Sequence, residues 1–158
     1  MMYPPLIESP LISLDAKNRI KQISSQLTSP MGAYTSNSKG HMFIRESVAR
    51  FIEDRDGPAV VADWNNIYMT NGASEGVRMA FKMLIRDSKD GIMVPIPQYP
   101  LYSALLTLDG GTMVKYYLDE SKQWGVDAEE IEQRIKNAKD LGIKLRGMVV
   151  INPGNPTG

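Results

Sequence analysis

The sequence predicts an α/β fold in which a mostly parallel sheet is flanked by helices on both faces. Two observations indicate this class. From residue 67 onward, short strand-like runs alternate with longer segments of helical periodicity. The strand-like runs are rich in apolar residues, and the helices between them are amphipathic. Buried strands that alternate with amphipathic helices are typical of a parallel sheet covered on both sides.

The chain before residue 67 predicts an irregular lead-in and two helices. Residues 1–14 contain prolines and show no clear period. Apolar residues between Ala16 and Leu27 lie on one helical face, and Pro30 ends that helix. A small and polar loop covers 32–40. The helix that follows it ends at Asp56 and Gly57, where glycine suits the C-terminal cap.

The remaining elements follow in strict alternation. The predicted strands are Ile67–Thr70, Gly91–Pro95, Thr112–Leu118 and Gly147–Ile151. Helices begin near Ser74, at Pro100, which suits a first helical turn, and at Asp127, which with Glu130 resembles a capping box. We therefore expect residues 1–31 to form an N-terminal lead-in and helix, and residues 32–158 to form part of one larger domain.

Composition and charge exclude several classes of function. Lys plus Arg and Asp plus Glu both number 18, so the overall charge favours neither nucleic acid nor an anionic membrane as partner. The absence of Cys and the single His exclude disulfides, thiolate metal sites and multi-histidine metal sites. No apolar run approaches the thickness of a bilayer, and the first residues lack the pattern of a signal peptide.

The turn Gly72–Gly76 has three possible interpretations. It matches G-x-S-x-G between a predicted strand and a helix, as the nucleophile turn of a serine hydrolase does, with Ser74 as nucleophile. It could instead bind an anion, because small residues at a helix start let backbone N–H groups approach a phosphate. The third interpretation is a helix start capped by serine. The hydrolase mechanism requires a histidine after Ser74. The only histidine, His41, precedes Ser74, which argues against a hydrolase.

Two further turns follow predicted strands. The prolines at 95, 97 and 100 stiffen the loop that contains Tyr99, and a stiff loop can hold a ring for stacking on a flat heterocycle. A plain connector with Tyr99 packed on a neighbour is the alternative. Asn155 lies in a proline-restricted segment after the last strand, and its amide can donate to a phenolate oxygen and a carboxylate. Because ligands in such sheets lie at the carboxyl ends of strands, the three turns together indicate one site.

These motifs resemble those of alanine aminotransferases, which are class I/II, fold type I pyridoxal-phosphate-dependent enzymes. The resemblance runs from about Gly32 to Gly158. It is carried by the segments 32–35, 44–45, 55–57, 70–74, 95–103 and 151–158, of which the last two are long and specific.

The resemblance implies a role for each site residue. Ala73 and Ser74 would hold the phosphate of pyridoxal 5'-phosphate, and Tyr99 would stack on its ring. Asn155 would bond the phenolic oxygen of the ring and help to orient the substrate carboxylate. Tyr34 would reach the cofactor phosphate of the neighbouring subunit in a homodimer. The resemblance also makes Ile96–Pro97 and Asn155–Pro156 candidates for cis peptide bonds.

The reaction implied is amino-group transfer between L-alanine and 2-oxoglutarate, giving pyruvate and L-glutamate. The partners are therefore small amino acids and 2-oxo acids. The lysine that forms the Schiff base in this family lies beyond residue 158, so no catalytic residue falls in this chain and we expect it to be truncated and inactive alone, with weak or absent cofactor binding. A self-associating, non-catalytic fragment is the other expectation. We expect the protein in the cytoplasm, with the mitochondrion as the alternative.

Overall fold

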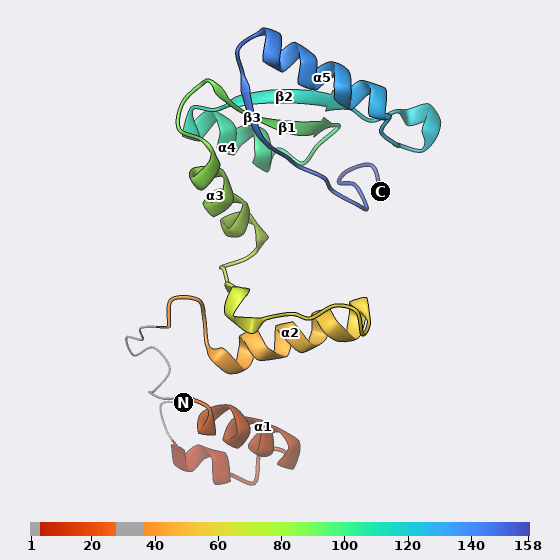
Figure 1. The fold of residues 1–158 in the computed structure, drawn as a ribbon. Helices are drawn as coiled ribbons and strands as arrows, with labels where there is room; N and C mark the ends of the chain where they lie inside the picture. The colour runs from red at the N-terminus through yellow and green to blue at the C-terminus, as the bar shows by residue number, and fades with distance from the viewer. Residues whose placement is uncertain (1–3, 28–36) are drawn as a thin grey trace. The chain divides into compact units, whose positions relative to one another are not determined.

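The structure is a computed structural model that describes residues 4–27 and 37–158. It divides into two compact units, Met1–Thr70 (unit 1) and Asn71–Gly158 (unit 2), shown in Figure 1. None of the helices in the described ranges combines the length and the apolar character that a bilayer-spanning segment requires.

Unit 1 contains two helices and little buried apolar surface. Its helices are α1 (Leu14–Ser25) and α2 (Met42–Asp56), and short 3-10 turns cover Pro4–Glu8 and Trp64–Asn66. Helix α2 ends at Gly57, whose φ of 87° is an angle that glycine adopts without strain, as the sequence predicted. Among the described residues of this unit, only Arg45 and Ala49 are buried.

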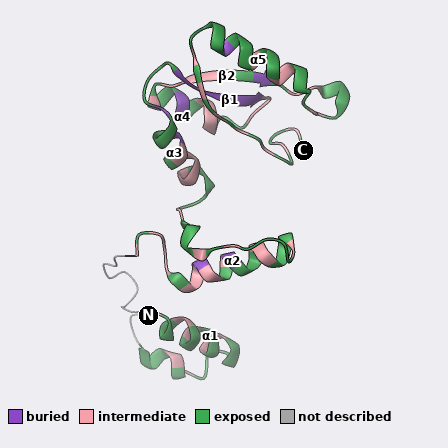
Figure 2. Cartoon of the chain, viewed as in Figure 1, coloured by how far each residue is buried: buried purple, intermediate pink, exposed green. Residues whose placement is uncertain are grey.

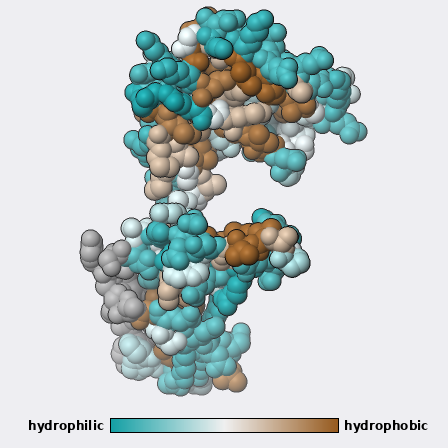
Figure 3. Space-filling model, in the orientation of Figure 1, coloured by the Kyte–Doolittle hydropathy of each residue, from teal (hydrophilic) through white to brown (hydrophobic). Residues whose placement is uncertain are grey.

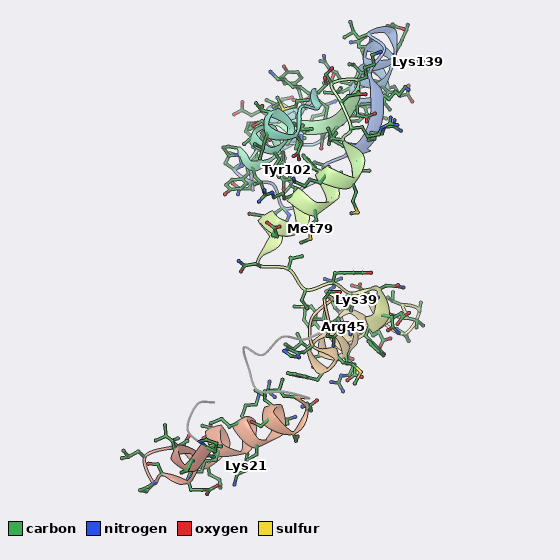
Figure 4. The ribbon with its side chains drawn as sticks, turned by 90° about the vertical axis from the view of Figure 1, so that its left-hand side faces the viewer. Lys21, Lys39, Arg45, Met79, Tyr102 and Lys139 are labelled. Carbon is green, nitrogen blue, oxygen red and sulfur yellow. The ribbon has the colours of Figure 1, made fainter. Side chains whose placement is uncertain are left out.

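Arg45 is the centre of unit 1. Its side chain is 4% exposed and lies over the Trp64 ring, 4.9 Å from the centroid. The guanidinium donates to the carbonyls of Gly40 and Trp64 and to the amide oxygen of Asn37. Beside it, Lys39 donates to the carbonyl of Asn65, and both cations are labelled in Figure 4. Hydrogen bonds to charged donors, rather than apolar packing, thus hold the loops of unit 1 together.

The strand predicted at Ile67–Thr70 is wrong. The side chain of Asp63 accepts a hydrogen bond from the backbone N–H of Asn65, which stabilises the 3-10 turn directly before this segment. The segment itself makes a single described backbone bond to another part of the chain, from Met69 N–H to Lys39 O. No strand in 4–27 or 37–158 pairs with this segment, so its apolar pattern does not produce a ladder there.

Unit 2 is built on a parallel sheet, which confirms the predicted fold class. Its strands β1 (Asp90–Ile96), β2 (Thr112–Tyr117) and β3 (Lys144–Met148) lie in the order β2-β1-β3. The third strand begins three residues earlier than predicted. Because β3 pairs on one side only, its residues alternate between exposed and half-buried instead of forming a wholly buried run.

Helices cover both faces of this sheet. Helices α3 (Ala73–Leu84) and α4 (Leu101–Asp109) pack on one face, and α5 (Ala128–Asp140) on the other (Figure 1). A buried apolar cluster lies between the sheet and helices α3 and α4, and β1 contributes two of its residues (Figure 2). Its members are Phe81, Ile85, Ile92, Val94, Leu105 and Leu106. Burial of each large side chain contributes about 1.5–3 kcal/mol to folding.

A buried carboxylate closes the amino end of the sheet. Asp90 is fully buried and accepts hydrogen bonds from the side chain and backbone N–H of Arg86 and from the side chain of Arg146. The hydrogen bond from Arg86, followed by that from Arg146, holds the pKa of the Asp90 carboxyl far below its usual range. The network joins the α3–β1 connection to β3.

An extra residue in β3 explains how Arg146 reaches Asp90. The register passes from Gly91 opposite Leu145 to Ile92 opposite Gly147, so Arg146 has no partner on β1. This is a β-bulge, and a bulge redirects the side chain of its extra residue. Here it places the Arg146 Nε 2.6 Å from Asp90.

The capping box predicted at Asp127 and Glu130 is wrong. Asp127 makes no side-chain cap and pairs instead with Lys122 Nζ at 2.7 Å. Glu130 accepts from Arg134, one turn later, and from the backbone N–H of Tyr117. Both carboxylates find stronger charged partners than the helix start offers. The Glu130 contact joins α5 to β2.

Candidate functional site

The amino terminus of α3 carries the first predicted site segment. Gly72 is the N-cap residue, with a φ of 83°, and as a glycine it has no side chain of its own to cap the helix. A side-chain carbon built on Gly72 would meet no atom within 4 Å, so the space beside it is open. Ala73 and Ser74 are both exposed. The first N–H groups of a helix have no partner inside it and carry a partial positive charge, so this end is suited to an anion.

The loop between β1 and α4 carries Tyr99. The Ile96–Pro97 bond is cis, as predicted, and Pro100 is the N-cap residue of α4. Tyr99 is 46% exposed, so its ring is available to a ligand. The neighbouring Gln98 has a buried side-chain oxygen with no hydrogen-bond partner within the described ranges.

Tyr102 ties this loop to the helices that cover the sheet. Its ring, labelled in Figure 4, lies 6.4 Å from the ring of Phe81 in α3. The first turn of α4 therefore packs against α3.

The segment that follows β3 carries Asn155. Val149 continues the pairing by donating to Met93 O, and its carbonyl accepts from the Tyr116 hydroxyl at 2.7 Å. The Asn155–Pro156 bond is cis, as predicted, and Asn152–Pro153 is a further cis bond that the sequence did not indicate. Asn155 is exposed at the surface of this segment.

A hollow of about 330 Å³ lies under this segment, on the face of the sheet that α5 covers. It is bounded by the carboxyl ends of the strands, the loop that precedes α5 and the C-terminal segment. Its lining includes Pro95, Tyr116, Trp124, Met148, Ile151 and Gly154. Figure 3 shows hydrophobic side chains on the visible face of unit 2. Met148, which lines the hollow, is 41% exposed.

The structure brings two of the predicted segments to the same end of neighbouring strands. β1 and β3 are paired and parallel, so the loops carrying Tyr99 and Asn155 leave the sheet at one edge. Ser74 lies in the first turn of α3, the helix that leads into β1. None of the three residues lines the hollow described above. Tyr34 lies outside the described residues.

Sequence reasoning did not single out two residues of this edge, Gln98 and Tyr116. Gln98 lies within the proline-rich motif, but no pattern indicates that its side-chain oxygen is buried. Tyr116 reads only as an aromatic residue of a strand. Its hydroxyl contact depends on a residue 33 positions later in the chain, which no local pattern reveals.

The comparison with protein families identifies the class of this protein. Residues 10–158 match the model of the aminotransferase class I and II family. The chain belongs to this family, whose members generally use pyridoxal phosphate.

Individual relatives agree with this assignment. The chain is 48% identical to alanine aminotransferase 2 of Panicum miliaceum and 47% identical to glutamate–glyoxylate aminotransferase 2 of Arabidopsis thaliana. These alignments cover 99% and 98% of this chain but only 33% and 32% of the relatives. Alanine aminotransferase 1 of Homo sapiens is 43% identical over 98% of the chain and 32% of its own length. The chain thus spans about a third of the relatives it matches.

Solved structures show the same fold. An aminotransferase from Escherichia coli is 31% identical, with a TM-score of 0.67 over 87% of this chain and 30% of that one. An alanine aminotransferase from Pyrococcus furiosus is 26% identical, with a TM-score of 0.67 over 87% of this chain and 32% of that one. Family membership also leaves the serine hydrolase interpretation of Ser74 without support.

The residues present fit pyridoxal phosphate in chemical type. The start of α3, with its glycine N-cap and exposed Ala73 and Ser74, suits a dianionic phosphate. The exposed ring of Tyr99 suits stacking on a pyridine, and the exposed amide of Asn155 suits a phenolic oxygen.

Proposed function

We propose that this chain forms the cofactor-binding part of an aminotransferase that transfers an amino group between L-alanine and 2-oxoglutarate. The observation that carries the proposal is the amino terminus of α3, which begins at a glycine N-cap and exposes Ala73 and Ser74, in a chain that belongs to the class I and II aminotransferase family. Relatives named as alanine aminotransferases, two of which are 48% and 43% identical to this chain, support the choice of substrate.

The start of α3 would hold the cofactor phosphate. The backbone N–H groups of Ala73 and Ser74 lie in the first turn, and the Ser74 hydroxyl adds a third donor. An anion at this position gains from both the unpaired donors and the helix dipole. Holding the phosphate fixes the position of the ring relative to the sheet.

Tyr99 and Asn155 would orient the ring. Tyr99 would stack on one of its faces, and the cis Ile96–Pro97 bond and Pro100 define the path of the loop that holds it. The Asn155 amide would donate to the phenolic oxygen and contact the substrate carboxylate. When bound, the cofactor supplies an electron sink for the carbon that loses its proton.

The remaining functions would come from sequence that the relatives have and this chain does not cover. We propose that the complete enzyme is a homodimer to which Tyr34 contributes a phosphate contact across subunits. We also propose that this chain alone binds the cofactor weakly and does not transaminate. Its large domain would begin near residue 32.

A chimera tests the proposed function. Residues 1–158 replace the aligned segment of the Panicum miliaceum alanine aminotransferase, and pyruvate formation from L-alanine and 2-oxoglutarate is measured. We expect pyridoxal-phosphate-dependent turnover. Parallel assays with glyoxylate as amino acceptor compare the substrate named for the Arabidopsis relative. A folded chimera that retains the cofactor but prefers glyoxylate would overturn the alanine assignment.

Two matched asparagines test the site within this chimera. Asn155 and Asn152 are both exposed and both precede a cis proline. Asn155→Ala should lower kcat/KM about ten- to a hundredfold, the loss expected for one hydrogen bond to a charged group. Asn152→Ala should change it less than about threefold. Equal effects of the two substitutions would contradict the assigned role of Asn155.

A further inference from the structure

Pro95 interrupts the pairing of β1 with β3. In a parallel ladder, a residue that donates to one residue of the neighbouring strand accepts from the residue two positions further along that strand. Val149 donates to Met93 O, so the regular donor to Val149 O would be the N–H of residue 95. That residue is proline and has no N–H. The paired register accordingly ends at Met93 opposite Met148.

The hydroxyl of Tyr116 replaces the missing donor. Tyr116 lies on β2, on the other side of β1, and is the register partner of Pro95. Its hydroxyl reaches past β1 and donates to Val149 O at 2.7 Å. The side chain is 2% exposed, and burial raises the pKa of the hydroxyl, so it stays protonated and able to donate at neutral pH. One side chain thus continues the sheet where the backbone cannot.

This contact is the last described hydrogen bond between the sheet and residues 149–158, the segment that contains Asn155. After Val149, the described backbone bond is internal to the segment, from Gly158 N–H to Gly154 O. Thr157 packs its hydroxyl against Gly154, where a larger residue would collide with it. The segment is therefore a compact turn that is joined to the sheet through Val149. We infer that the orientation of Val149 determines where Asn155 lies.

We propose that Tyr116 is a positioning residue that sets the place of Asn155 by substituting for the absent N–H of Pro95. The assignment of Asn155 to the cofactor rests on the proposed function above. The anchoring of the segment does not.

Hydrogen–deuterium exchange of the 158-residue chain tests the anchoring without any cofactor. Tyr116→Phe retains the ring and removes only the hydroxyl. It should speed exchange of the Val149 amide, which donates to Met93 O, by roughly tenfold, as expected for loss of one buried hydrogen bond. Tyr117→Phe is the matched control: its ring lies 5.1 Å from Arg134, it is 48% exposed, and its hydroxyl makes no hydrogen bond in the described part of the chain. Unchanged exchange in Tyr116→Phe would overturn the proposal.

A rescue experiment separates donor replacement from general loosening. Pro95→Ala restores an N–H at the position where the ladder requires one. In the Pro95→Ala background, Tyr116→Phe should accelerate exchange of the Val149 amide by less than about twofold, because the backbone can now donate to Val149 O. The same acceleration in both backgrounds would show that Tyr116 acts by packing and would refute the substitution for the missing donor.

The chimera tests the consequence for Asn155. Tyr116→Phe should shift the pH dependence of the absorption spectrum of the bound cofactor in the same direction as Asn155→Ala. In the Asn155→Ala background it should have no further effect. Faster exchange together with an unchanged spectrum would overturn the positioning role. A wild-type chimera that retains no cofactor would instead refute the proposed function, and the exchange result would still stand.

Discussion

The two ends of β1 differ in how their polar groups are satisfied. At the amino end, the fully buried Asp90 accepts from four donor groups of two arginines. Lys144 N–H and the Thr112 hydroxyl donate to the carbonyls of Lys89 and Ser88. At the carboxyl end, the Gln98 oxygen is buried without a described partner, and Tyr99 is exposed.

This difference teaches where the unit obtains stability and where it retains binding capacity. A buried ion network adds rigidity when every group is paired. An exposed donor or ring adds little to folding but can contact a ligand. The amino end should therefore determine the stability of unit 2, while substitutions at the carboxyl end should alter binding with little effect on folding.

Asp90→Asn should have the largest effect on stability. The substitution removes the negative charge of a carboxylate that has no exposure to solvent and pairs with two guanidinium groups. We expect the midpoint of urea unfolding, measured by circular dichroism, to fall strongly. The control is Asp87→Asn, at an exposed residue whose side chain accepts from Lys89 N–H, a bond that the amide oxygen of Asn can keep. The Asp87 charge also acts on Arg86, so the control removes a neighbouring charge without removing the buried one. If the two variants unfolded together, the amino end would not be the stabilising one.

Acid should weaken the unit through the same residue. Because the pKa of Asp90 is lowered by folding, chiefly by Arg86, its contribution is complete above the unfolded value of roughly 4 and is lost as the pH falls below it. The urea midpoint of the wild type should fall between about pH 5 and pH 2, and less steeply in Asp90→Asn. Some slope should remain, since hydrogen bonds from Ser121 and Arg134 also lower the pKa values of Asp119 and Glu130. Parallel curves for the two proteins would contradict this assignment.

Gln98→Met should have the smallest effect and the opposite sign. Methionine has a similar length and lacks the oxygen that is buried without a described partner. Removal of an unpaired buried acceptor should raise the free energy of unfolding by about 1 kcal/mol. In the chimera, the same variant reports whether a ligand uses that oxygen. A destabilised Gln98→Met chain would mean that the oxygen already has a donor within the folded protein.

The sequence predicted the elements of unit 2 well because their signals are local. The apolar runs gave three strands, the helical periods gave α3, α4 and α5, and the prolines at 97 and 156 gave two cis bonds through the family resemblance. The site residues Ser74 and Tyr99 were placed correctly at a helix start and in a strand-to-helix loop. Their roles toward a cofactor remain predictions.

What the sequence missed depends on the partner that each residue finds in the folded chain. The segment Ile67–Thr70 had the composition of a strand, but no strand of the described residues pairs with it. Asp127 and Glu130 had the spacing of a capping box, but Lys122 and Arg134 offered them charged partners. The network of Asp90 joins residues 56 positions apart. This last contact follows from the register of the sheet, which no local pattern contains.

The bulge at Arg146 has a consequence for how this chain tolerates changes in length. Deleting that residue would let Leu145 and Gly147 follow each other opposite Gly91 and Ile92, and the ladder would become regular. The straightened strand would lose the arginine that reaches Asp90. It would also be one residue shorter, so the segment that follows β3 would start one position earlier along the sheet. Natural variants of this family should therefore vary in length in the exposed loop before α5 and not between residues 144 and 149.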